Sequence, residues 1–207
     1  MGSCCGNDVR FDGASKGYRR ALWAVIAINA VMFVVEMTAG ALSGSRALQA
    51  DALDFLGDSF TYSISLFVIG KALISRANAA LFKGVTLGLM GLWVLGSTVY
   101  HSLVLGLPSA PIMGAVGALA LAANLTSVVI LMRYRDGDAN VRSVWLCSRN
   151  DAIGNVAVIG AALMVGVTAS PWPDLIVAAL MATLFLRSAS LILRQAWQER
   201  REALTAH

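Results

Sequence analysis

The sequence predicts an all-α membrane protein with six transmembrane helices and both termini in the cytoplasm. Of its 207 residues, 57% are hydrophobic and only 14% are charged, whereas soluble domains average about 45–50% apolar and about 25% charged residues. The apolar residues lie in six long segments, each near the roughly 20 residues that a helix needs to cross a bilayer. Basic residues concentrate in alternate connections. Together these features exclude a soluble globular domain.

The six apolar segments are joined by short connections, and prolines mark two of them. Pro108 and Pro111 separate the third segment from the fourth, and Pro171 and Pro173 separate the fifth from the sixth. A missing backbone N–H costs least at such turns, so we expect helical hairpins at both places. The predicted spans are residues 21–42, 47–70, 84–107, 110–132, 143–169 and 172–193.

Outside these segments, Lys and Arg residues lie on one side of the arrangement. They occur before the first segment, between the second and third, between the fourth and fifth, and after the sixth, whereas the opposite connections hold only Arg46. Cytoplasmic connections carry the Lys/Arg excess. We therefore expect a polar cytoplasmic tail over 1–19, a six-helix domain over 20–193 and a short cytoplasmic tail over 194–207. The expected location is the bacterial inner membrane.

Three acidic residues interrupt the second apolar segment. Asp51, Asp54 and Asp58 fall within roughly 60° of one another on a helix that advances about 100° per residue. A carboxylate at the bilayer centre costs about 2.5–3.5 kcal/mol on insertion scales. Three anionic groups on one helix face therefore require protons or a cation between them.

The fifth segment carries a matching polar face. Cys147, Asp151 and Asn155 follow one another at one-turn spacing. Asp54, Asp58, Asp151 and a Cys147 thiolate would supply four ligands of the number and hardness that suit Zn²⁺, whereas Mg²⁺ prefers more oxygen ligands and retained water. The predicted metal ligands are therefore these four residues. Two alternatives stay open: Cys147 is a small buried packing residue, and Asn150 or a water supplies the fourth donor.

Four further polar residues lie in or beside the apolar segments, and the sequence allows two roles for each of them. Asp51 either passes ions or protons outward or is hydrated near the outer end of its helix. Glu36 and Asn124 either line a cavity or form hydrogen bonds between helices. Arg149 either extends to the cytoplasmic interface or pairs with an acid when the metal site is empty.

Two cysteines precede the first segment. Cys4 and Cys5 are adjacent, and with Cys147 they do not make a disulfide framework. We expect Cys4 and Cys5 to lie in a disordered tail, with transient metal capture as the alternative.

The stretches SRALQADALDFLGDS and VRSVWLCSRNDAIGNVAVI resemble the cation diffusion facilitator family of divalent-metal/proton antiporters. That family carries [H/D]-x-x-x-D motifs in its second and fifth helices. Asp54 and Asp58 match the first motif, and Cys147 and Asp151 match the second. The resemblance covers nearly all of the chain and implies six spans with cytoplasmic termini.

Two departures from the family pattern are visible. Cys147 stands where the family usually has His, and a thiolate favours Zn²⁺ or Cd²⁺ over Mn²⁺. The chain also ends before the soluble cytoplasmic domain that most members append, so the resemblance predicts a short member without that domain.

The predicted function is efflux of a divalent transition-metal cation, Zn²⁺ first and Cd²⁺ or Co²⁺ next, in exchange for protons. The two metal-binding helices alternate between inward-open and outward-open states. The alternative is a membrane metal-binding or sensor subunit that does not transport. No enzyme activity, resident cofactor or nucleic-acid partner is expected, and an intramembrane zinc hydrolase is disfavoured because no H-E-x-x-H motif occurs.

Gly84 and Gly88 form a small-xxx-small pair, and we expect a homodimer formed through transmembrane helices.

Overall fold

The computed structural model describes residues 15–68, 73–104, 106–134 and 139–205. Within these ranges the chain forms six α-helices and one short 3-10 turn, and no strand. The all-α prediction is thereby confirmed. The elements are α1 (Lys16–Ser43), α2 (Arg46–Val68), α3 (Leu73–Val104), α4 (Ala110–Leu131), η1 (Met132–Tyr134), α5 (Ala139–Thr168) and α6 (Trp172–Thr205).

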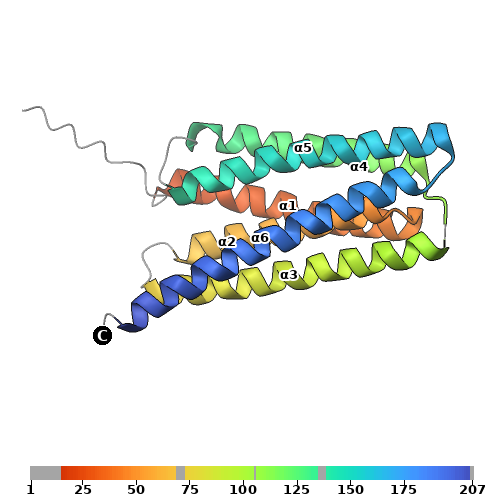
Figure 1. Ribbon diagram of the computed structural model, residues 1–207. Coiled ribbons are helices and arrows are strands. Elements are labelled where there is room, and N and C mark those ends of the chain that lie inside the picture. Colours follow the sequence, from red (N-terminus) through yellow and green to blue (C-terminus); the bar gives the residue numbers. More distant parts are fainter. Residues whose placement is uncertain (1–14, 69–72, 105, 135–138, 206–207) are drawn as a thin grey trace, which may run out of the picture.

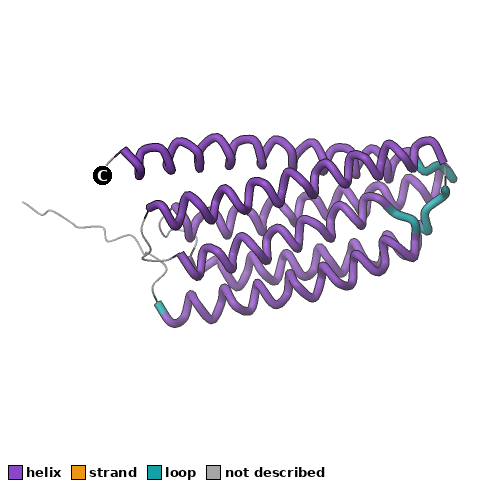
Figure 2. The backbone as a smooth tube through the Cα atoms, turned by 90° about the horizontal axis from the view of Figure 1, so that it is seen from below, coloured by secondary structure: helices purple, strands orange, loops and turns teal. Residues whose placement is uncertain are grey.

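The helices form one elongated bundle and alternate in direction (Figure 1). The connections around Gly44, 106–109 and 169–171 lie at one end of the bundle, which we name the hairpin end (Figure 2). The start of α1 and the end of α6 lie at the opposite end, which we name the termini end. The most extensive packing joins α3 to α6, α1 to α2, and α4 to α5, whereas α2 contacts α5 far less.

Within the described residues, five helical stretches are long and apolar enough to cross a membrane. The helix α2 does not qualify, because Arg46 and the three aspartates interrupt it. Large apolar side chains point outward from the bundle, with Leu42 79% and Val167 83% exposed, as expected for a surface in contact with lipid. The chain is therefore a membrane protein with several spans. The qualifying stretches are Lys16–Ser43, Ala80–His101, Ala110–Tyr134, Ser148–Thr168 and Trp172–Gln198.

The helices α3 and α6 extend furthest beyond their predicted apolar limits. The helix α3 begins at Leu73 and α6 continues to Thr205, whereas the predicted spans begin at 84 and end at 193. Bilayer thickness limits the apolar stretch, but backbone hydrogen bonds continue a helix through polar residues as well. At the other end of the chain, Ser15 caps the start of α1, because its hydroxyl accepts a hydrogen bond from the Tyr18 amide at 3.2 Å.

The glycine pair of α3 is used inside the chain. A Cβ atom placed on Gly84 would lie 2.8 Å from Leu193 Cγ of α6, and one on Gly88 would lie 3.6 Å from Ala189 Cβ. A Cβ on Gly91 would lie 3.0 Å from Leu186 Cγ. This face lets α3 and α6 approach closely, so the dimer contact considered for Gly84 and Gly88 is replaced by packing within one chain.

A buried carboxylate connects two helices at the hairpin end. Asp174 of α6 accepts hydrogen bonds from the Ser45 hydroxyl at 2.6 Å, the Arg46 amide at 2.7 Å and the Ala47 amide at 3.1 Å. These donors include the otherwise unpaired amides at the start of α2. The Arg46 side chain also contacts the ring of His101 on α3. The start of α2 is therefore fixed to both α6 and α3.

Candidate metal centre

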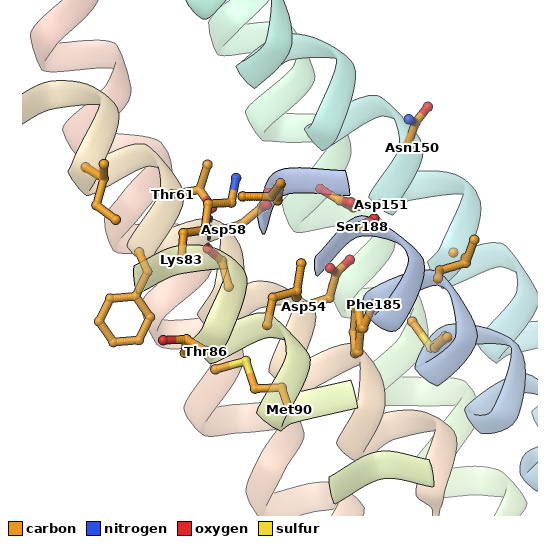
Figure 3. Close-up of a pocket in the computed structure, with 18 of the residues that line it drawn as sticks. Asp54, Asp58, Thr61, Lys83, Thr86, Met90, Asn150, Asp151, Phe185 and Ser188 are labelled. Carbon is orange, nitrogen blue, oxygen red and sulfur yellow. Dashed lines mark hydrogen bonds between the residues drawn. The ribbon is translucent and has the colours of Figure 1, made fainter. Parts of the chain in front are cut away.

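The predicted acidic ligands face a cavity of about 370 Å³. Asp54 and Asp58 of α2 line it together with Asp151 of α5, while α3 and α6 supply the remaining walls (Figure 3). The one-turn spacing of Asp54 and Asp58 places both carboxyls on the same helix face. Asp51, which the same periodicity places on this face, is not among the residues that line the cavity.

The cavity extends toward the termini end of the bundle. On α2 it is lined from Asp54 to Ile64, and on α6 from Met181 to Ile192. Both stretches run from the middle of the bundle toward that end. Toward the hairpin end, Ala47, Leu48 and Val94 belong instead to the buried apolar core. The acids are therefore approached from the side that holds the termini.

The carboxyl of Asp151 contacts those of both other aspartates. The Asp151 carboxyl lies within hydrogen-bonding reach of both Asp54 and Asp58. The Tyr62 hydroxyl donates to Asp58 and also lies 3.2 Å from the Ser148 hydroxyl oxygen. Ionised carboxylates only accept hydrogen bonds, so the contacts of Asp151 require a shared proton or a cation.

The structure does not close a ligand shell around one point. Within the described residues, no group of three His, Cys, Asp or Glu side chains is arranged to hold a metal ion. The three predicted aspartate ligands therefore line one cavity, and they form no finished metal site with other described residues. Mutual repulsion of carboxylates opposes closer approach when no cation lies between them, and the sparse packing of α2 against α5 leaves room for the two helices to move together.

The fourth ligand stays a prediction. Cys147 lies on α5 one turn before Asp151, but its side chain is outside the described residues. Asn150 is exposed at the edge of the cavity and projects away from Asp54 and Asp58 (Figure 3). Its Oδ1 accepts a hydrogen bond from Arg149 at 3.4 Å. The structure thus brings the aspartates together and does not bring Asn150 to them.

Lys83 is a cavity residue that the sequence analysis missed. It was assigned to a basic connection, but α3 begins ten residues earlier, at Leu73. Lys83 lines the cavity beside Asp58 (Figure 3) and interacts electrostatically with both Asp54 and Asp58. The helical spacing of Lys83, Thr86 and Met90, which all line the cavity, is the signal that identifies this face of α3.

Two further acids lie outside the cavity. Glu36 of α1 and Asp51 of α2 are buried, with exposed fractions of 0% and 1%. Their carboxyls lie within hydrogen-bonding reach of each other. Asn124 and Asn155 are also buried, with 2% and 0% of their surfaces exposed. The polar residues noted inside the apolar segments therefore face the interior of the bundle and not the lipid.

A helical membrane bundle whose interior cavity is lined by carboxylates has the architecture of an ion carrier. The sequence matches the cation efflux transmembrane domain over residues 22–199. The chain therefore belongs to the cation efflux family, which is the cation diffusion facilitator family that the sequence resembles. This is a family of transporters.

Three relatives illustrate the similarity. The chain is 25% identical over 190 residues to the metal cation efflux system protein CzcD of Cupriavidus metallidurans, covering 86% of this chain and 60% of that protein. It is 29% identical over 200 residues to the zinc transporter ZitB of Pectobacterium atrosepticum, covering 88% and 61%. It is 27% identical over 192 residues to the cadmium, cobalt and zinc/H(+)-K(+) antiporter of Bacillus subtilis, covering 86% and 60%. The chain spans about three fifths of the length of these relatives.

The Tyr62 hydroxyl gives a test of the site geometry. Tyr62→Phe removes the donor to Asp58 and should weaken metal binding by about 10–100-fold, because groups that orient a ligand tune its affinity to that degree. Titration calorimetry of the purified protein with Zn²⁺ measures the change. Tyr100→Phe is the matched control, since Tyr100 is 63% exposed on α3. Equal affinities in Tyr62→Phe and wild type would show that Tyr62 does not orient Asp58.

Proposed function

We propose that this protein exports a divalent transition-metal cation in exchange for protons, with Asp54, Asp58 and Asp151 as ligands and Cys147 as the fourth. The observation that carries the proposal is the cavity in which carboxyls from α2 and α5 meet beside a path toward the termini end. The distribution of Lys and Arg assigns that end to the cytoplasm. The cation therefore enters the site from the cytoplasm.

Zn²⁺ is the proposed principal substrate. One relative is named as a zinc transporter and another as an antiporter of cadmium, cobalt and zinc. Three carboxylates and one thiolate match the tetrahedral preference of Zn²⁺, and the sulfur also favours Cd²⁺. Mn²⁺ prefers a site with oxygen ligands alone.

Binding and release follow from the chemistry of the ligands. A cation between α2 and α5 replaces carboxylate repulsion by attraction, so it draws the two helices together around the site. Because the carboxyls and the thiol must be deprotonated to bind metal, protons arriving from the opposite side compete with the cation and release it. Reorientation of the helices around the midplane site then gives alternating access.

Lys83 supplies a tethered cation to this cycle. When metal is absent, its ammonium group offsets the charge of Asp54 and Asp58 from the wall formed by α3. When a divalent cation enters, the two positive charges compete for the same carboxylates. Lys83 therefore limits the affinity of the cytoplasm-facing site and keeps the empty site from accumulating uncompensated charge.

The flanking parts of the chain belong to the same proposal. Residues 1–19 and 194–207 lie on the cytoplasmic side of a six-helix domain over 20–193. Homodimerisation uses transmembrane faces other than the glycine face of α3, because α6 covers that face at Gly84, Gly88 and Gly91.

Removal of one carboxylate tests the site. Asp54→Asn, Asp58→Asn and Asp151→Asn should each reduce Zn²⁺ flux into proteoliposomes by more than about tenfold, since each removes one of few charged ligands. Thr86→Val is the control, because Thr86 lines the cavity without charge and its hydroxyl bonds to Phe82 within α3. Flux close to wild type in any aspartate variant contradicts the site. Binding without flux in the wild type favours the sensor alternative.

Cys147 tests the metal preference. Cys147→Asp should shift transport toward Mn²⁺, and Cys147→His should retain Zn²⁺ while losing Cd²⁺, because thiolate sulfur is the softest ligand in the proposed set. Competitive transport of paired metals by wild type and both variants measures the ranking. An unchanged ranking of Cd²⁺, Zn²⁺ and Mn²⁺ would mean that Cys147 only packs.

Lys83 tests the competition between fixed and mobile cations. Lys83→Met should raise Zn²⁺ affinity by about tenfold, equivalent to about 1.4 kcal/mol, while Lys83→Arg should stay near wild type. Arg187→Met is the matched control, since Arg187 is an exposed cation on α6. Titration calorimetry at low ionic strength is the measurement, because salt screens the effect. Equal Zn²⁺ affinity in Lys83→Met and wild type removes Lys83 from the mechanism.

A further inference from the structure

Glu36 and Asp51 form a buried acidic pair between α1 and α2, outside the cavity. Glu36 has 0% and Asp51 1% of its surface exposed, and their carboxyls lie within hydrogen-bonding reach. Neither Glu36 oxygen, nor Asp51 Oδ2, accepts a hydrogen bond from any donor in the described part of the chain. Because ionised carboxylates only accept hydrogen bonds, a contact between the two groups requires a proton on one of them.

Within the part of the chain that the structure describes, no positive charge lies beside this pair. Glu36 interacts electrostatically with Asp51 and Asp54, which are both acidic. The helix α4, which packs against α1, carries no charged residue between Ala110 and Leu131. Among the described residues, the other charged groups that face the interior belong to two separate clusters: Arg46, His101 and Asp174 at the hairpin end, and Asp54, Asp58, Lys83 and Asp151 around the cavity.

The free-energy cost of burying carboxyl oxygens without hydrogen-bond donors distinguishes this pair from a contact that only packs helices together. A buried polar group without a partner costs several kcal/mol, and an isolated buried charge costs more. A pair that served only packing would have donors to satisfy its oxygens, as Asp174 has at the start of α2. Both Glu36 oxygens and Asp51 Oδ2 have no such donor among the described residues, which points to an occupant that the protein itself does not provide.

We propose that Glu36 and Asp51 form a proton-binding site separate from the metal ligands, in which the two carboxyls share one proton. Asp51 lies three residues before Asp54, which places it about 4.5 Å closer to the hairpin end along the helix axis. The pair therefore lies between the metal ligands and the proposed external side. The inference rests on the proposed metal/proton exchange and names a further group that carries the exchanged proton.

The pair contributes to the return of the empty carrier. After metal leaves toward the hairpin end, a proton bound between Glu36 and Asp51 reduces the negative charge that the helices must carry back. On the cytoplasmic side the O–H bond breaks, the proton leaves through the cavity, and the acid that held it becomes a carboxylate. No other co-reactant is needed, because the proton gradient supplies the proton.

Two transport assays separate this role from metal binding. Metal–metal counterflow exchanges Zn²⁺ for Zn²⁺ and does not need the proton-loaded return, whereas uptake driven by a pH gradient does. Glu36→Gln and Asp51→Asn should keep counterflow within about twofold of wild type and lose more than about tenfold of the gradient-driven uptake. Glu36→Asp should recover part of the lost uptake. Asn29→Ala is the matched control, because Asn29 is equally buried on α1, at 1% exposed, and is not an acid.

A spectroscopic readout tests the proton directly. The proposed cycle places the proton on the metal-free carrier, so part of the infrared band from protonated carboxyls in metal-free protein reports the Glu36–Asp51 pair. At neutral pH that band should keep its intensity in metal-free Asn29→Ala and lose intensity in metal-free Glu36→Gln. An unchanged band in Glu36→Gln overturns the proposal, and so does the absence of such a band in metal-free wild type, even where the variants fail to fold.

The remaining outcomes also decide the question. Unchanged gradient-driven uptake in both variants overturns the proton site, and loss of counterflow together with uptake assigns the pair to the metal path instead. If wild-type protein shows neither counterflow nor uptake, the proposed transport fails. The infrared spectrum of the Asp54→Asn, Asp58→Asn, Asp151→Asn triple variant then decides separately whether the pair holds a proton.

Discussion

The need to compensate buried negative charge determines how this bundle is organised. A carboxylate in the hydrocarbon region is costly unless a cation, a proton or a set of hydrogen-bond donors lies beside it. The interior of this bundle holds Glu36, Asp51, Asp54, Asp58, Asp151 and Asp174. Their environments differ in what compensates them, and these differences divide the bundle into a fixed part and a part that responds to ions.

The fixed part is the hairpin end together with the pair of helices α3 and α6. Asp174 holds the first residues of α2 through three hydrogen bonds, and the glycines of α3 allow α6 to approach closely along that pair. The contact between α2 and α5, where the proposed ligands lie, is less extensive than that between α3 and α6. A cation bound there would act on this smaller contact, while the start of α2 stays anchored.

Periodicity made the main features of the site predictable from the sequence. Apolar length and basic connections predicted the helical membrane fold, and the one-turn spacing of Asp54 and Asp58 predicted a shared helix face. Lys83 was missed because hydropathy placed it outside the third apolar segment, whereas the helix begins at Leu73. The sequence also could not predict that α6 packs against Gly84 and Gly88 of α3. A small-residue pattern shows that a helix can approach closely, and it does not identify which helix does so.

The contrast between Asp174 and the Glu36–Asp51 pair shows how the same functional group takes opposite roles in one bundle. Asp174 is 1% exposed and is surrounded by donors that belong to the chain, so its negative charge is compensated permanently and stabilises one arrangement of helices. Glu36 is equally buried but both of its oxygens lack a donor among the described residues, so its compensation must come from a particle that can leave. Donor supply, and not burial, therefore separates an acid that holds helices together from an acid that is able to exchange ions.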